Sequence, residues 1–204
     1  SEYNQIVDIG FKIRDAINIY YETNSQEDPT SNFQWEFVLV DDDQTKNAWC
    51  MPGGKIAFYS GILPILKNED GVASVMGHEI AHAVARHSAE RASTAMVTDL
   101  GIMALEQFVL GQRLPQAAGY VRQFGLDLPF NRKQESEADY LGLIFSSLAG
   151  YDINESYKVW ERMKEDMGGS GPSEFFSTHP SPDNRIKNLK EWIPIVSKQY
   201  PVIG

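Results

Sequence analysis

Cysteine is nearly absent from this 204-residue chain, which contains only Cys50. A single cysteine excludes an internal disulfide and a zinc site built from several thiolates, and it leaves the redox compartment open. Clusters of basic residues are missing as well: 18 Lys and Arg stand against 28 Asp and Glu, and the formal net charge is −10. Since nucleic acids are bound by clustered Lys and Arg, we expect no nucleic-acid partner.

Long apolar runs are also missing. The most apolar stretch, residues 95–111, is interrupted by Asp99 and Glu106 and falls short of the ~18 uncharged residues that indicate a transmembrane helix. We therefore expect no transmembrane segment in this chain. The N-terminus shows no basic-then-apolar leader, so either the native protein has none or a leader has been removed.

The residues that are present predict more helix than strand. Apolar residues recurring every three or four positions from Ile6 to Tyr20 predict an opening amphipathic helix. β-branched and aromatic side chains predict strands at 33–40, 47–51 and 55–59. Further helices are expected at 70–84, 94–110, 115–124 and 132–148, then after Asp152 and at Ser181 and Pro182. Because nothing forces two domains, we predict one α+β domain over residues 1–204 with a single small sheet.

The strongest chemical signal is the sequence HEIAH at residues 78–82, inside a predicted helix. Positions i and i+4 lie about 40° apart around a helix axis, so His78 and His82 can present imidazole nitrogens to one point. Two imidazoles leave room on zinc for a third protein ligand and a water, whose proton Glu79 can accept during attack on a peptide carbonyl. The alternative is a helix carrying two surface or capped histidines. His87 is expected beside the site or at the surface, not as a ligand.

A third ligand is predicted within residues 131–142. Glu135 and Asp139 are four positions apart and share a helical face, whereas Glu137 lies about 200° away from Glu135. A carboxylate ligand at Glu135 would place Asp139 where it can hold a ligating histidine through the free ring N–H. The alternative is a solvated acidic face. Together with the histidine motif, the spacing favours Glu135 as the ligand.

Four segments in this order carry a family resemblance: NAWCMPGGKIAFYSGIL (47–63), HEIAHAVARHSAER (78–91), ESEADYLG (135–142) and STHPSPDNRI (177–186). They resemble the gluzincin group of zinc metallopeptidases that includes HtpX, BepA and the type I CAAX prenyl endopeptidases, most of all its soluble, periplasmic BepA-like branch. The resemblance implies one Zn2+ per chain and makes Glu135 its third ligand. It also implies a mainly helical zincin-type domain in which substrate lies along the edge strand of the sheet, facing the active-site cleft. The matching segment is Lys55, Ile56, Ala57, Phe58 and Tyr59.

The resemblance assigns further roles near the C-terminus. Residues 168–181 are expected to form a mobile loop or plug, in which His179 takes the fourth zinc position and makes the resting enzyme latent. A role for His179 as a transition-state donor, or as a bystander, stays open. Arg185 is expected to donate to the oxyanion, as a catalytic residue alongside Glu79 and Asp139.

These residues predict a zinc-dependent metalloendopeptidase, a hydrolase that acts on proteins or peptides. The family implies a place in the bacterial periplasm or cell envelope, with misfolded envelope or outer-membrane proteins as substrates in protein quality control. The alternative is a zinc-stabilised binding or chaperone-like module of envelope protein assembly with little proteolysis. The intact Glu79 argues against it, because a purely structural site needs no base.

Overall fold

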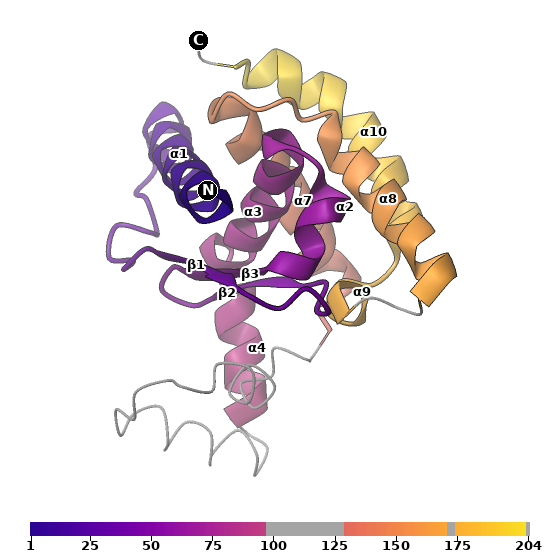
Figure 1. The fold of residues 1–204 in the computed structure, drawn as a ribbon. Coiled ribbons are helices and arrows are strands. Elements are labelled where there is room, and N and C mark those ends of the chain that lie inside the picture. The colour runs from indigo at the N-terminus through magenta and orange to yellow at the C-terminus, as the bar shows by residue number, and fades with distance from the viewer. Residues whose placement is uncertain (97–128, 171–173, 203–204) are drawn as a thin grey trace.

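Helices dominate the computed structural model, which describes residues 1–96, 129–170 and 174–202 (Figure 1). The helices are α1 (Glu2–Thr23), α2 (Leu63–Leu66), α3 (Glu69–Val84), α4 (His87–Met96), α7 (Arg132–Leu148), α8 (Glu155–Ser170), α9 (Glu174–Thr178) and α10 (Pro182–Gln199), with a 3-10 turn at Ser60–Ile62. The strands are β1 (Glu36–Val40), β2 (Ala48–Met51) and β3 (Lys55–Tyr59). The predicted α+β class with one small sheet is confirmed. The expected helix at 115–124, and that at 94–110 apart from residues 94–96, lie outside the described residues.

The sheet has the order β1-β3-β2, which places β3 in the centre. β3 pairs in parallel with β1 and antiparallel with β2. The prediction that Lys55, Ile56, Ala57, Phe58 and Tyr59 form an edge strand is therefore wrong. Its backbone groups are shared between two neighbouring ladders, so this strand has no free side on which a substrate could pair.

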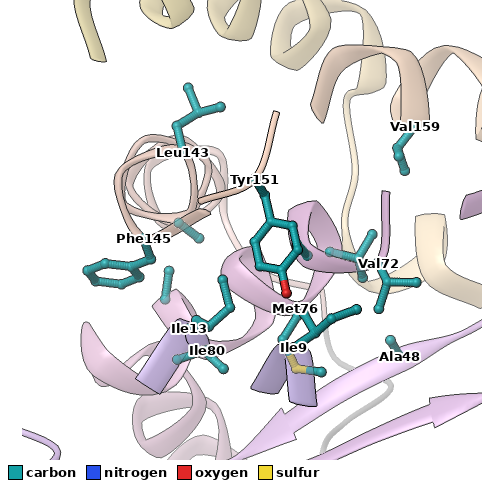
Figure 2. Packing of buried hydrophobic residues seen from close by; sticks show 14 of the residues in the cluster. Ile9, Ile13, Ala48, Val72, Met76, Ile80, Leu143, Phe145, Tyr151 and Val159 are labelled. Carbon is teal, nitrogen blue, oxygen red and sulfur yellow. The ribbon is translucent and has the colours of Figure 1, made fainter. Parts of the chain in front are cut away.

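Helix α3 runs through the middle of the molecule, between α1 on one side and α8 on the other, above the sheet (Figure 1). It is buried on nearly every face, because α1, α7, α8 and β2 all pack against it. Its N-cap is Asn68, whose side chain accepts from the Gly71 N–H at 2.9 Å, so the helix starts one residue before the expected start at residue 70. Figure 2 shows its apolar side: Met76 and Ile80 lie among side chains of α1 and α7, including Ile13.

Two glycines let α3 and α7 cross in close contact. A Cβ atom at Gly142 would lie 3.0 Å from the backbone nitrogen of His78, and one at Gly77 would lie 2.7 Å from Ser146 Oγ. Helix α7 itself starts where expected, because Asn131 and Gln134 form a reciprocal capping box. The crossing therefore brings the backbone of α7 directly against the first histidine of the motif.

The C-terminal segments return to the same place. Much of the predicted plug, residues 168–181, is helical, since α8 reaches Ser170 and α9 covers Glu174–Thr178. His179 follows α9, and the left-handed Ser181 (φ 65°) turns the chain into α10 without a side-chain capping bond. Among the described residues, no helix has both the length and the apolar character needed to cross a membrane.

A candidate metal centre

Four side chains from three separate parts of the chain converge in the interior. His78 and His82 come from α3, Glu135 from the first turn of α7 and His179 from the turn between α9 and α10. All four are buried, and one ligand atom from each lies within 4.8 Å of the others. The structure thus brings together the four residues that the sequence proposes as ligands.

The distances between these atoms suit zinc. His78 Nε2 lies 3.1 Å from His82 Nε2 and 3.2 Å from His179 Nδ1. Glu135 Oε1 lies 3.1 Å from His82 Nε2 and 2.9 Å from His179 Nδ1. Ligand atoms at 2.0–2.1 Å from a tetrahedral zinc ion are about 3.3 Å apart, so small adjustments would seat the ion.

The charge states of the ligands also fit a divalent cation. Burial lowers the pKa of His82 well below its ordinary value, which keeps the imidazole neutral with a free lone pair. Burial alone would raise the pKa of Glu135, but the charges of Arg185 and His179 hold it well below its usual range, as a carboxylate. Neutral imidazole and carboxylate are the ligands that zinc takes in catalytic sites.

His179 lies between the other ligands and Glu79. Its Nδ1 faces His78 and Glu135, whereas its Nε2 lies 3.1 Å from Glu79 Oε1. Burial lowers the pKa of His179, but the nearby carboxylates of Glu135 and Glu79 outweigh it and raise the pKa to about 9. With this raised pKa the free imidazole is protonated on both ring nitrogens at neutral pH. Because a metal ligand needs a free lone pair, metal binding through Nδ1 requires His179 to lose its Nδ1 proton.

Arg185 and Asp139 lie behind the ligands. Arg185 donates from Nε and Nη2 to the two Asp139 oxygens at 2.7 and 2.6 Å, and its Nη1 pairs with Glu135 Oε2. Asp139 Oδ1 also lies 3.0 Å from His78 Nδ1, which is the place expected for a carboxylate that orients a ligand. The guanidinium is held at 3.6 Å over the Trp160 ring. This geometry favours a role in fixing the carboxylates over the predicted role as oxyanion donor.

Two further residues lie beside the site: the sequence gave little sign of Phe130, whereas it predicted His87 beside the site or at the surface. Phe130 stacks on His82 at a centroid distance of 3.7 Å, and its N–H donates to the Thr178 carbonyl at 3.0 Å. The one feature of the sequence that could have pointed to Phe130 is its position directly before Asn131, the N-cap of α7. His87 is buried against His82 because α3 ends at Val84 and the chain turns sharply before α4.

Together the fold and the site define a class, a zinc metallopeptidase domain of the hydrolases, with two histidines from one helix and a glutamate from a second. The sequence agrees with this class. Residues 18–193 match the model of peptidase family M48, and the chain belongs to that family. The zinc cofactor inferred from the sequence is confirmed by this membership and by the convergent ligands.

Individual relatives are mitochondrial and bacterial. The chain is 45% identical over 166 residues to the mitochondrial metalloendopeptidase OMA1 of Schizosaccharomyces pombe, covering 80% of this chain and 48% of that protein. It is 36% identical over 211 residues to OMA1 of Saccharomyces cerevisiae, covering 96% and 57%. A beta-barrel assembly-enhancing protease of Yersinia pestis is 30% identical over 168 residues, covering 76% and 34%. The chain thus spans about half the length of the two fungal relatives, or a little more.

The comparisons correct one prediction. A location in the bacterial periplasm or cell envelope is wrong, because the relatives of higher identity are named as mitochondrial proteins and the beta-barrel assembly-enhancing proteases are more distant. The motifs that carry the resemblance bear on the metal site, which would be the same in either compartment. They show the family but could not distinguish its branches.

Proposed function

We propose that this chain is the catalytic domain of a zinc-dependent endopeptidase. The observation that carries the proposal is the convergence of His78, His82 and Glu135 beside a buried glutamate, Glu79. Zinc bound there supplies an activated water and polarises the carbonyl of the scissile bond. Glu79 accepts the proton of the attacking water and delivers it to the leaving amine. A purely structural zinc site would give no reason to keep a carboxylate buried at this position.

The residues behind the ligands prepare the site before substrate arrives. Asp139 accepts the Nδ1 proton of His78 and so directs the lone pair of Nε2 toward the ion. Arg185 holds Asp139 and Glu135 in fixed positions and balances their charges in an interior that water does not reach. This arrangement keeps the ligand geometry set while Glu79 moves the proton.

We place the substrate along β2. In the part of the chain that the structure describes, β2 pairs with β3 alone, and its other side carries no strand. The Tyr59 N–H donates to the Asn47 carbonyl, so by antiparallel alternation Trp49 bonds to β3 and the backbone of Cys50 faces away. β2 also runs close to the general base: burial and the charge of Glu79 together raise the pKa of the Cys50 thiol. An extended peptide pairing with β2 would lie beside Glu79.

We further propose that the described state is latent. The His179 imidazole fills the space between Glu79 and the other ligands, where the water and the scissile carbonyl must stand. Its ring is stacked on Phe175 at 4.3 Å, and the preceding Thr178 is tied to Phe130 through the backbone. Substrate access therefore requires the α9–α10 turn to withdraw.

The relatives named as mitochondrial metalloendopeptidases support a mitochondrial location and protein or peptide substrates. Fractionation of cells that produce the tagged protein tests the location, and recovery outside mitochondria would contradict it. An unfolded, fluorescently quenched protein is the appropriate first probe of cleavage.

The catalytic proposal is tested by separating metal binding from proton transfer. Glu79→Gln should keep one zinc per chain and lose cleavage by about 10²- to 10⁴-fold, the usual contribution of a general base. His78→Ala should lose the zinc. Metal analysis and cleavage assays on purified variants, in both the parent and the His179→Ala background, give the answer. Stoichiometric zinc in His78→Ala, or full activity in Glu79→Gln, would contradict the assignment.

A further inference from the structure

The two ligand histidines are held in different ways. His78 Nδ1 meets the carboxylate of Asp139 directly. His82 Nδ1 instead meets another imidazole, His87 Nδ1, at 3.0 Å, and His87 Nε2 meets Glu137 Oε2 at 2.8 Å. The His87 side chain is only 4% exposed whereas that of Glu137 is 51% exposed. A hydrogen-bonded chain therefore runs from a ligand of the site to the surface of α7.

Given the proposed zinc ligation of His82, each proton position in this series of hydrogen bonds determines the next. A neutral His82 that offers the Nε2 lone pair carries its proton on Nδ1. That N–H donates to His87 Nδ1, so the proton of His87 must sit on Nε2. His87 Nε2–H then donates to the Glu137 carboxylate, which can only accept. Each bond leaves one arrangement for the next.

The backbone is bent to bring His87 into this position. On a continued helix, a residue five positions after His82 would lie on a different face. Here α3 ends at Val84 and Arg86 adopts a left-handed conformation, with φ of 66°, before α4 begins at His87. A non-glycine residue in that conformation costs about 1–2 kcal/mol, so the contact that the turn makes has to compensate for it.

We propose that His87 and Glu137 are positioning residues for His82. They contact neither the metal position nor a substrate. His87 fixes the tautomer and the ring orientation of His82, and Glu137 fixes those of His87. Zinc affinity, and not only catalysis, therefore depends on both. Glu137 is the acidic residue that the helix phase excludes as a ligand, and here it acts on the ligand His82 through His87.

The test measures zinc affinity by competition with a chromogenic chelator, on the full chain after metal removal. His87→Leu fills the space without an acceptor, and we expect zinc binding to weaken by about 10- to 100-fold. In His87→Asn the side-chain oxygen can replace Nδ1, so most of the affinity should return. Glu137→Gln should lose less than about tenfold. Glu191→Gln, an equal change of charge at an exposed site on α10, should lose none.

A spectroscopic measurement separates hydrogen bonding from packing. The zinc-loaded parent and His87→Asn should show a slowly exchanging proton on His82 Nδ1 by nuclear magnetic resonance, and His87→Leu should not. Equal zinc affinity in the parent and His87→Leu would overturn the inference, as would a His87→Asn variant as weak as His87→Leu. If His87→Leu does not fold, the zinc affinities of Glu137→Gln and Glu191→Gln are compared instead, and equal affinities would overturn the inference. A parent that binds no zinc would instead refute the proposed function itself.

Discussion

At the scale of single residues, Arg185 of α10 joins the two carboxylates that α7 brings to the site. Its guanidinium contacts two carboxylates and the face of Trp160 while fully buried. Burial alone would raise the pKa of Asp139, but the charge of Arg185 lowers it below its ordinary value. Removing one member of such a group leaves an uncompensated charge in the interior, typically at a cost of about 3–5 kcal/mol. The position of α10 is therefore coupled to the charge states of Glu135 and Asp139 on α7.

Tyr151 allows a prediction about alkaline pH. Burial, with the charges of Glu69, Asp70 and Asp8, raises the pKa of Tyr151 to about 12, above the ordinary value of 10.0. The folded state keeps the Tyr151 proton to a higher pH than the unfolded state does, so the protein should lose stability as the pH rises from ~10 to ~12. Tyr151→Phe should lose less stability over this range. Because the hydroxyl has no hydrogen-bond partner among the described residues, the variant should also be more stable by about 1 kcal/mol at pH 8.

Urea unfolding at pH 8 and pH 11 checks this prediction, with Tyr3→Phe at an exposed position as the control. Tyr21, whose pKa burial also raises to about 12, should leave part of the alkaline loss in place. Identical losses in the parent and Tyr151→Phe would show that this hydroxyl does not titrate with unfolding.

At the scale of elements, the contact of α3 with α7 sets the distance between the histidines and Glu135. Gly142→Ala would place a methyl group 3.0 Å from the backbone nitrogen of His78. Alanine is the better helix former by about 1 kcal/mol, so any loss of stability must come from crowding. We expect net destabilisation by about 1–2 kcal/mol and zinc binding weaker by about tenfold, because the ligands of the two helices move apart.

Thermal unfolding and chelator competition measure these two effects separately. Gly10→Ala is the matched control, since its methyl group would meet the Phe37 ring at 2.2 Å, in α1 and away from the ligands. It should lower stability and leave zinc affinity unchanged. Unchanged zinc binding in a destabilised Gly142→Ala would show that the crossing does not set the site.

The β2 edge makes a second prediction at this scale. Cys50→Pro removes a backbone N–H that faces away from β3, so it should spare the sheet and remove a donor to substrate. In the His179→Ala background, kcat/KM for an unfolded protein should fall roughly three- to tenfold, the worth of one backbone hydrogen bond, with zinc content unchanged. Cys50→Ala, which loses only the thiol, should keep its activity. A folded Cys50→Pro variant that cleaves normally would exclude β2 as the platform.

A structural feature could be predicted from the sequence where residues close together in the chain determine it. Helix α7 starts and ends where expected, because the capping box and the apolar spacing lie within the helix itself. The prediction that β3 is an edge strand was wrong, because strand order depends on contacts between distant segments. The role of His87 was left open, because the left-handed turn that positions it is made by Arg86 and not by a glycine, which would have marked the turn in the sequence. The closeness of His78 to His82 could be predicted because i, i+4 spacing places two side chains together on any helix.

At the scale of the whole molecule, the site is assembled from both halves of the chain. The histidine motif lies on α3, while Glu135, His179 and Arg185 follow residue 128. α9 and α10 pack on the rest of the domain by aromatic and ionic contacts: Phe175 packs on Trp160 of α8, and Arg185 pairs with Asp139 of α7. We propose that the C-terminal segments act as a cover whose docking energy sets how often the site opens.

The last prediction concerns that cover. If the closed state holds all but about 0.1–10% of the molecules, removing its ligand should raise basal cleavage by roughly 10- to 1,000-fold. We expect this of His179→Ala, with zinc retained on His78, His82 and Glu135. Phe175→Leu, which loosens the stack on His179, should give a smaller rise. The double variant should be no more active than His179→Ala, because Phe175 acts through His179. Equal or lower activity in metal-replete His179→Ala would remove the latch and return His179 to a donor or bystander.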